Sequence, residues 1–236
     1  MLYYENENGK LYQGDCLEVM DKLIEEGVKV DCIVTDPPYR TISGGNKKGL
    51  SYKHKGSITE KNDGKIFKYN DIKIEYWLPK IYEILKENSH CYIMTNTLNL
   101  KNTLIETEKI GFKLHNLLVW EKQNATPNRW YMKNCEYILF LRKGIAKAIN
   151  NMGSKTVHKF KNPFGDKLHP TEKSIDHMMF LIENSTKEDD IILDPFSGSG
   201  TTAVACENTN RKWICIEKED KYCEISKKRL DNSNQK

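Results

Sequence analysis

The fold is decided by one stretch, residues 30–39, which reads VDCIVTDPPY. Its first six residues are mostly apolar and β-branched, so they predict a buried strand. The strand must end at the two prolines, because neither donates a hydrogen bond to a neighbouring strand and each restricts the residue before it. Asp36 is therefore expected in a stiff turn at the carboxyl end of a strand, where open α/β sheets bind ligands, with the flat ring of Tyr39 beside it. Taken alone, the stretch is equally compatible with a purely structural turn.

The composition is typical of a soluble globular protein rather than a membrane protein. A chain of 236 residues can form one sizeable domain, and 30% of its residues are charged. No apolar stretch is long enough to cross a bilayer, and the first residues do not have the layout of a signal peptide. The seven cysteines form no C-x-x-C pair, which favours buried thiols in a reducing cytoplasm over disulfides or a metal site.

Positive charge is concentrated in two segments, although the net charge is only +4. Residues 40–68 and residues 141–173 each hold eight Lys or Arg against two acidic residues, a net of +6 apiece, so the remaining chain sums to −8. This distribution indicates a polyanionic partner such as a nucleic acid. Solvated lysine-rich loops are the alternative for either segment.

Strands alternate with helices along the chain, and no internal repeat is evident. This order predicts an α/β protein with a doubly wound, mostly parallel sheet. Residues 40–70 are expected to form a long polar loop, and residues 144–168 show little periodicity. Strands are expected at 11–15, 30–35, 91–94, 112–120, 136–141, 191–193 and 213–216; helices are expected after Asp15, at 72–87 with a kink or break at Pro79, at 98–110, after Lys173, after Gly200 and at 218–231.

A second motif lies near the other end of the chain, where Asp194 to Thr202 read DPFSGSGTT. This stretch has the order of a nucleotide-binding fingerprint: a strand, the glycines Gly198 and Gly200, a helix, a second strand and the acidic Glu217. The glycines allow the backbone to approach a ligand, and a carboxylate at the end of the following strand can accept hydrogen bonds from both ribose hydroxyls.

Dinucleotide-dependent dehydrogenases use the same device, but the position of the motif argues against them. Only about one helix follows Glu217, so the sheet has to be completed by strands encoded earlier in the chain. The acidic Asp194 just before the glycines also suits a cofactor that carries a positive charge.

With both motifs in hand, the chain resembles the S-adenosylmethionine-dependent DNA amino-methyltransferases of the β order, in which the catalytic Asp-Pro-Pro-Tyr motif precedes the glycine motif. The resemblance covers nearly the whole chain. It implies a permuted Rossmann-like methyltransferase fold as a single catalytic domain over residues 1–236, with residues 40–70 as a basic insertion. It is carried by Gln13-Gly14-Asp15, Asp36 to Tyr39, the strands at 91–94 and 136–141, His169 to Lys173, Asp194 to Thr202 and Glu217.

The resemblance implies catalytic roles for Asp36, Pro37 and Tyr39. The Asp36 carboxylate and the Pro37 carbonyl would accept the two hydrogens of the target amine, whose lone pair is otherwise delocalised into the base. Tyr39 would stack on a base flipped out of the duplex. A C5-cytosine enzyme would need a Pro-Cys nucleophile, and the sequence contains no Pro-Cys pair.

For the cofactor, S-adenosylmethionine, the resemblance implies a set of side chains and backbone groups. Glu217 would hold the ribose and Asp15 the adenine amine, although Asp15 could instead serve only as a helix cap. The methionine end and its surroundings would involve Asp36, Lys173, Asp194, Phe196, Gly198, Gly200 and Thr201. Phe196 could equally be a core residue, and Ser174 departs from the proline that commonly ends the His-Pro-Thr-Glu-Lys motif, so the geometry at Lys173 is left open.

The favoured function is therefore transfer of a methyl group to the N6 amine of adenine in a short site in double-stranded DNA, within a restriction–modification, phage or orphan system. Asp36 favours adenine, because the family's cytosine members more often have Ser at that position. N4-cytosine methylation, RNA adenine methylation and a non-catalytic DNA- or cofactor-binding subunit are the alternatives, and a homodimer is left open. The target-recognition segment is expected at 144–168. Because it is short, either the basic insertion shares recognition or the specificity is relaxed or short. Arg129 and Trp130 could reach DNA or belong to the core.

Overall fold

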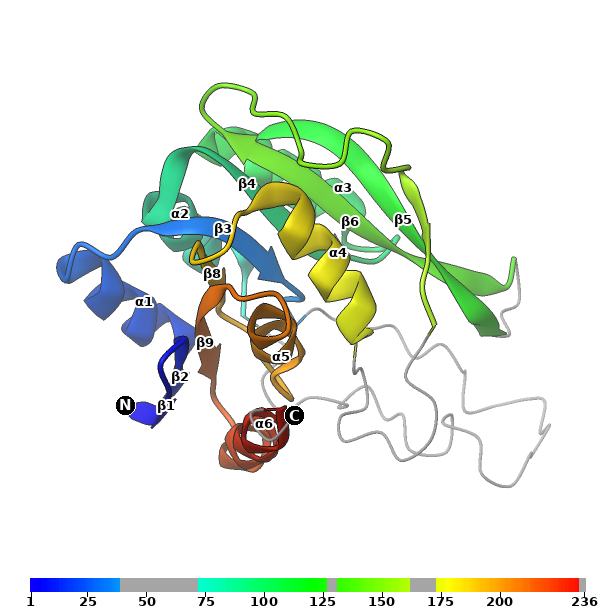
Figure 1. Ribbon diagram of the computed structural model, residues 1–236. Coiled ribbons are helices and arrows are strands. Elements are labelled where there is room, and N and C mark those ends of the chain that lie inside the picture. Colours follow the sequence, from blue (N-terminus) through cyan, green and yellow to red (C-terminus); the bar gives the residue numbers. More distant parts are fainter. Residues whose placement is uncertain (39–71, 127–130, 162–172, 234–236) are drawn as a thin grey trace, which may run out of the picture. The chain divides into compact units, whose positions relative to one another are not determined.

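In the computed structural model, the described residues are 1–38, 72–126, 131–161 and 173–233. The chain divides into two compact units, residues 1–37 with 74–236 and residues 38–73. The first unit contains every helix and strand described below (Figure 1). The basic insertion expected at 40–70 lies outside the described residues, as do Arg129 and Trp130.

The first unit is built on one mixed sheet, in which the described residues form nine strands in the order β1-β2-β9-β8-β3-β4-β6-β5-β7. Five neighbouring pairs are parallel and three are antiparallel, so the expected mostly parallel α/β sheet is confirmed. The strands are β1 (Leu2–Glu5), β2 (Gly9–Gln13), β3 (Val30–Thr35), β4 (Leu85–Thr95), β5 (Lys113–Thr126), β6 (Lys133–Lys143), β7 (Val157–Lys159), β8 (Ile191–Asp194) and β9 (Lys212–Glu217).

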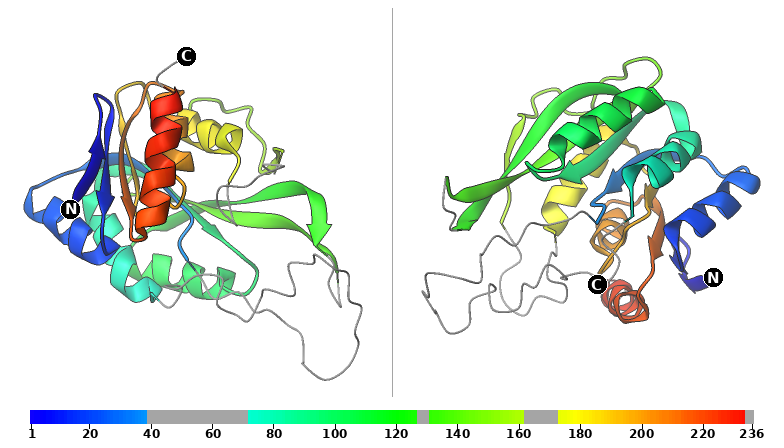
Figure 2. Two further views of the ribbon diagram at one scale, coloured as in Figure 1. Left: turned by 90° about the horizontal axis from the view of Figure 1, so that it is seen from below. Right: turned by 180° about the vertical axis from the view of Figure 1, so that it is seen from behind.

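Six helices in the described ranges cover the two faces of this sheet. Figure 2 (left) shows the first three helices along one face and the last three along the other, which is the doubly wound arrangement. None of these helices is long and apolar enough to cross a membrane. The helices are α1 (Cys16–Glu25), α2 (Ile74–Ile84), α3 (Leu100–Ile110), α4 (Ile175–Ser185), α5 (Thr201–Glu207) and α6 (Asp220–Ser233).

Local signals placed several element boundaries correctly. The strand expected at 30–35 is β3, and α3 ends at Gly111 in the left-handed region, with φ of 106°. Helix α2 is a single helix that continues through Pro79, so the expected break into two pieces is wrong. The strands expected at 91–94, 112–120 and 136–141 are longer, because they form a continuous antiparallel set, β4-β6-β5.

The sheet contains a topological switch point between β8 and β3. From β3 the chain passes through α2 to β4 on one side, whereas from β8 it passes through α5 to β9 on the other side. The two connections therefore diverge at the carboxyl ends of two adjacent parallel strands, where α/β proteins bind their ligands. Asp36 follows β3 and the glycine turn follows β8, so both predicted motifs lie at this point.

Candidate active site

The carboxyl ends of four parallel strands bring the predicted site residues to one edge of the sheet. Gln13 at the end of β2 pairs with Glu217 at the end of β9, and Asp194 at the end of β8 pairs with Cys215. Strand β3 is parallel to β8 and ends at Thr35. The four acidic positions that follow or end these strands, Asp15, Asp36, Asp194 and Glu217, therefore share this edge.

A buried hydrogen bond links the two motifs. Thr35 Oγ1 donates to Asp194 Oδ1 over 2.8 Å, while Thr202 Oγ1 donates to Asp194 Oδ2 over 2.6 Å. The backbone N–H of Phe196 donates to Asp194 Oδ1 as well. Burial raises the pKa of the Asp194 carboxyl to about 6, against the opposing effect of these three donors. In this arrangement Asp194 holds the start of the glycine turn against the end of β3.

Asp36 lies next to a lysine that it shares with a second carboxylate. Lys173 Nζ is 2.8 Å from Asp36 Oδ2 and 2.8 Å from Glu136 Oε2, and Lys122 Nζ pairs with Glu136 Oε1. Burial raises the pKa of the Asp36 carboxyl, and the Lys173 ammonium opposes that rise. Pro37 is buried beside Asp36, and Tyr39 lies outside the described residues.

The glycine turn has the backbone conformation that its sequence predicts. Gly198 and Gly200 have φ of 54° and 77°, in the left-handed region that favours glycine. A Cβ on Gly200 would lie 2.8 Å from Ser226 Cβ, so α6 packs too closely for any side chain there.

Glu217 closes the other side of the turn. Its Oε2 accepts from the backbone N–H of Gly198 over 2.8 Å, and its Oε1 accepts from the N–H of Glu219 over 2.7 Å. Burial raises the pKa of Glu217 to about 7, against the opposing effect of the N–H groups that bond to it.

Asp15 is the N-cap of α1, since its Oδ1 accepts from Leu17 N over 3.0 Å. Its other oxygen, Oδ2, accepts from Lys218 Nζ over 2.9 Å, next to Glu217 in sequence. Desolvation raises the pKa of Asp15, but the bonds from Lys218 and Leu17 outweigh it and lower that pKa below its ordinary value. The capping role is confirmed, and nothing in this geometry removes a second role toward an adenine amine.

Phe196 is half-buried and lies edge-on to Trp77, with 5.3 Å between ring centroids. Thr201 is buried at the start of α5 and accepts from Arg229 Nη1 over 3.3 Å. The structure therefore brings every described candidate to the same edge of the sheet: Asp15, Asp36, Pro37, Lys173, Asp194, Phe196, Gly198, Gly200, Thr201 and Glu217.

Two residues of α6 hold the glycine turn and were not predicted from the sequence. Ser226 Oγ donates to the carbonyl of Gly198 over 3.1 Å. Arg229 Nη1 donates to the carbonyl of Ser199 over 2.8 Å and to its Oγ over 3.0 Å. Their spacing of three residues places both on one face of a helix, which is a local signal, but α6 is otherwise so charged that it resembles a surface helix.

Two acidic motifs and a glycine turn at the switch point of an open α/β sheet are typical of cofactor-binding enzymes with a Rossmann-like fold, the class that includes the methyltransferases. The chain belongs to the DNA methylase family, whose model matches residues 30–228. The family match confirms the prediction that the chain is an S-adenosylmethionine-dependent DNA amino-methyltransferase.

Curated relatives and solved structures agree with this assignment. The chain is 31% identical to the type II methyltransferase M2.LlaDCHI of Lactococcus lactis subsp. cremoris, covering 97% of this chain and 91% of the relative. It is also 31% identical to the type II methyltransferase M2.DpnII of Streptococcus pneumoniae, covering 99% and 93%. A crystal structure of the M1.HpyAVI–SAM complex superposes with a TM-score of 0.74 at 29% identity, covering 94% of this chain and 99% of the other.

Proposed function

We propose that the protein transfers a methyl group from S-adenosylmethionine to the N6 amine of adenine in a short site in double-stranded DNA. The observation that carries the proposal is the position of Asp36, which follows β3 and is tied through Thr35 and Asp194 to the glycine turn. An acceptor for the amine and a cradle for the cofactor are thereby held at one edge of one sheet. Asp36, where the family's cytosine members more often have Ser, favours adenine over cytosine.

The residues at this edge fit the cofactor chemically. Adenosine offers a ribose diol and an exocyclic amine, all hydrogen-bond donors, and the side chains at adjacent strand ends, Glu217 and Asp15, are carboxylate acceptors. We assign the ribose to Glu217 and the adenine amine to Asp15. Phe196 and the backbone of Gly198 and Gly200 are assigned to the walls around the methionine end.

Three further candidates receive more limited roles. Asp194 is buried and its carboxylate already accepts three hydrogen bonds inside the protein, so we assign it to holding the turn rather than to pairing with the cofactor's positive charge. Thr201 is held by Arg229 and contributes to the base of the turn. Lys173 forms an ion pair with Asp36, so we assign it a position beside the reacting amine.

When bound, S-adenosylmethionine supplies a sulfonium methyl, whose C–S bond breaks as the N–C bond forms, with sulfur keeping the electron pair. Asp36 and the Pro37 carbonyl accept from the two amine hydrogens and so localise the nitrogen lone pair toward that methyl. Tyr39 is assigned to stacking on the flipped base. The methylated nitrogen then loses one proton to water, and no residue forms a covalent bond to the substrate.

Recognition and location complete the proposal. The basic segment 40–70 and residues 144–168 are assigned to the DNA contact, since each is rich in Lys. All seven cysteines are unpaired and six of them are buried, which supports a reducing, cytoplasmic compartment.

The test is transfer of labelled methyl from S-adenosylmethionine to unmodified genomic DNA, followed by nucleoside mass spectrometry and modification-aware sequencing. We expect N6-methyldeoxyadenosine at one short motif. Asp36→Ala should lose this activity while keeping most of its cofactor affinity. N4-methyldeoxycytidine as the product would assign cytosine instead, methylated RNA with untouched DNA would change the substrate, and a wild type without turnover would indicate a binding subunit.

A further inference from the structure

Four charged side chains form a continuous row that ends at Asp36: Lys122, Glu136, Lys173 and Asp36. The side chain of Lys173 is 10% exposed and that of Glu136 20% exposed, so the middle of the row is shielded from water. Lys173 Nζ lies at 2.8 Å from a carboxylate oxygen on each side. The two carboxylates can therefore be no further apart than twice that distance.

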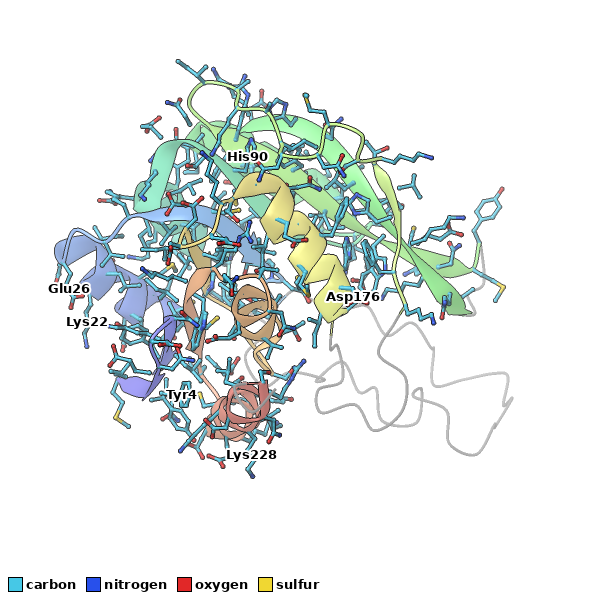
Figure 3. All side chains as sticks on the ribbon, in the orientation of Figure 1. Tyr4, Lys22, Glu26, His90, Asp176 and Lys228 are labelled. Atoms are coloured by element: carbon cyan, nitrogen blue, oxygen red, sulfur yellow. The ribbon has the colours of Figure 1, made fainter. Side chains whose placement is uncertain are left out.

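The topology of the sheet explains why Glu136 reaches this place. Strand β6 runs antiparallel to β4, with Tyr137 opposite Thr95 at the carboxyl end of β4. The residue before Tyr137 therefore lies at the same edge of the sheet as Asp36. Glu136 on β6 pairs with Trp120 on the neighbouring strand β5, and Lys122 lies two residues after Trp120 on β5. Lys173 lies directly before α4, whose first turn is marked by Asp176 in Figure 3.

The row contains two positive and two negative charges and is neutral as a whole. Removing one member of a shielded set leaves a charge that is not compensated, and the remaining partners respond to it. Lys173 is the shared member, because its ammonium binds Asp36 and Glu136 at equal distance. Without Glu136 the ammonium would bind Asp36 more tightly, in competition with the target amine.

We propose that Glu136 is a positioning residue for methyl transfer: it holds Lys173 from the side opposite Asp36 and so sets how strongly Lys173 binds the carboxylate that must accept the amine. This inference rests on the proposed function, since it assigns Asp36 to the amine. On this proposal the ion pairs of Lys173 and Lys122 do more than stabilise the fold. The Lys173 ammonium interacts with two carboxylates, the catalytic Asp36 and the supporting Glu136.

Within the part of the chain that the structure describes, the charges that act on Asp36 include those of Lys173, Glu136, Lys122 and Asp194. Burial raises the pKa of the Asp36 carboxyl; Lys173 lowers it, Glu136 raises it and Lys122 lowers it. Burial also acts to raise the pKa of Glu136, but Lys173 and Lys122 outweigh it and lower that pKa to about 2. Removing Glu136 and removing Lys173 should therefore move the titration of Asp36 in opposite directions.

The experiment measures the pH dependence of kcat with cofactor and DNA both saturating, for Glu136→Gln and Lys173→Gln. The acidic limb of this profile, where kcat falls as Asp36 is protonated, should move to lower pH by roughly one unit in Glu136→Gln. It should move to higher pH by roughly one unit in Lys173→Gln. At neutral pH, kcat should fall by about 10- to 100-fold in both, while the Kd for S-adenosylmethionine changes less than about threefold. A purely structural salt bridge would not shift the two limbs in opposite directions.

Glu121→Gln is the matched control, since Glu121 is on β5 next to Trp120 and pairs with Lys159 at 3.2 Å with more exposed side chains. It removes the same charge and should leave the acidic limb where it is. Lys122→Met is a second variant, used if the substitutions at the more buried Glu136 and Lys173 prevent folding. The side chain of Lys122 is 27% exposed, so its replacement should be tolerated better. Its limb should move up, by less than that of Lys173→Gln.

If the wild type is active and the folded variants have the same acidic limb in their pH profiles of kcat, Glu136 does not have this role. The proposed function would be unaffected by that result. A Kd for S-adenosylmethionine that rises in step with the loss of kcat in Lys173→Gln would also overturn the role of Glu136, by making Lys173 a cofactor contact. A wild type without turnover on any DNA would remove the proposed function and this inference together.

Discussion

Thr35 donates the hydrogen bond from its Oγ1 to Asp194 Oδ1 across 2.8 Å, although the two residues are 159 positions apart in the chain. Thr35 is the last residue of β3 and precedes Asp36, while Asp194 is the last residue of β8 and precedes the glycine turn. One buried bond therefore couples the position of Asp36, the proposed amine acceptor, to that of the glycine turn, the proposed cofactor cradle.

Replacing the hydroxyl of Thr35 tests this coupling. Thr35→Val keeps the shape but leaves the buried Asp194 carboxylate with one donor fewer, so the free energy of unfolding should fall by about 1–3 kcal/mol. Turnover should fall as well, because the two turns lose their fixed relation. Thr35→Ser keeps the donor and should retain most of both properties in urea unfolding and in methyl transfer. Equal behaviour of the Val and Ser variants would show that the bond has no such role.

The raised pKa of Glu217 predicts how cofactor affinity depends on pH. Ribose hydroxyls donate to the ionised carboxylate, so binding favours the form that has lost its proton and lowers a pKa that is about 7 in the free protein. Affinity should therefore weaken as the pH falls below 7, approaching about tenfold per pH unit, and binding near pH 6.5 should release a proton. Calorimetry in two buffers of different ionisation enthalpy measures both effects.

Glu217→Gln is the control for that experiment. It cannot ionise, so its weaker binding should lose the pH dependence that belongs to the carboxylate, and any dependence that remains belongs to the cofactor or to another titrating group such as Asp194. A variant that keeps the full pH dependence would place the titrating group elsewhere.

Local sequence signals predicted the central strands well and the edges of the sheet poorly. Residues 30–35 are a β-branched run ended by two prolines, and such a run needs no partner to be recognised. Strand β7 was not predicted, because it has three residues and exists through its pairing with β5, where Val157 lies opposite Val119. Strand β1 likewise depends on its antiparallel neighbour, β2.

The same distinction applies to the site. Asp36, Gly198 and Glu217 stand in motifs whose spacing is readable along the chain, and the structure places all three at one edge. Glu136 does not belong to any such motif. It reaches Lys173, 37 residues away, because an antiparallel strand returns to the carboxyl edge, and that contact depends on strand order rather than on local pattern.

Gly200 is expected to tolerate no side chain. Gly200→Ala would combine a φ of 77° with a Cβ 2.8 Å from Ser226 Cβ, so both stability and cofactor affinity should fall. Ser226→Gly in the same chain removes the clashing atoms but not the backbone strain, and it also removes the bond to the Gly198 carbonyl. The double variant should therefore recover part of the melting temperature lost by Gly200→Ala. No recovery at all would show that the conformation of the backbone, not the approach of α6, requires glycine here.

Asp15 combines a capping role that the structure shows with a cofactor role that is proposed, and two substitutions separate them. Asp15→Ser keeps an N-cap for Leu17 N but is too short to replace the longer carboxylate, so stability should be retained while the Kd for S-adenosylmethionine rises by about tenfold or more. Asp15→Ala loses both, with an additional destabilisation of about 1 kcal/mol. Lys218→Met, which removes the cation on Asp15 Oδ2, should raise the pKa of Asp15 and weaken binding less than Asp15→Ser does. If Asp15→Ser binds the cofactor as the wild type does, the carboxylate serves α1 alone, and the adenine amine must find its acceptor in another part of the site.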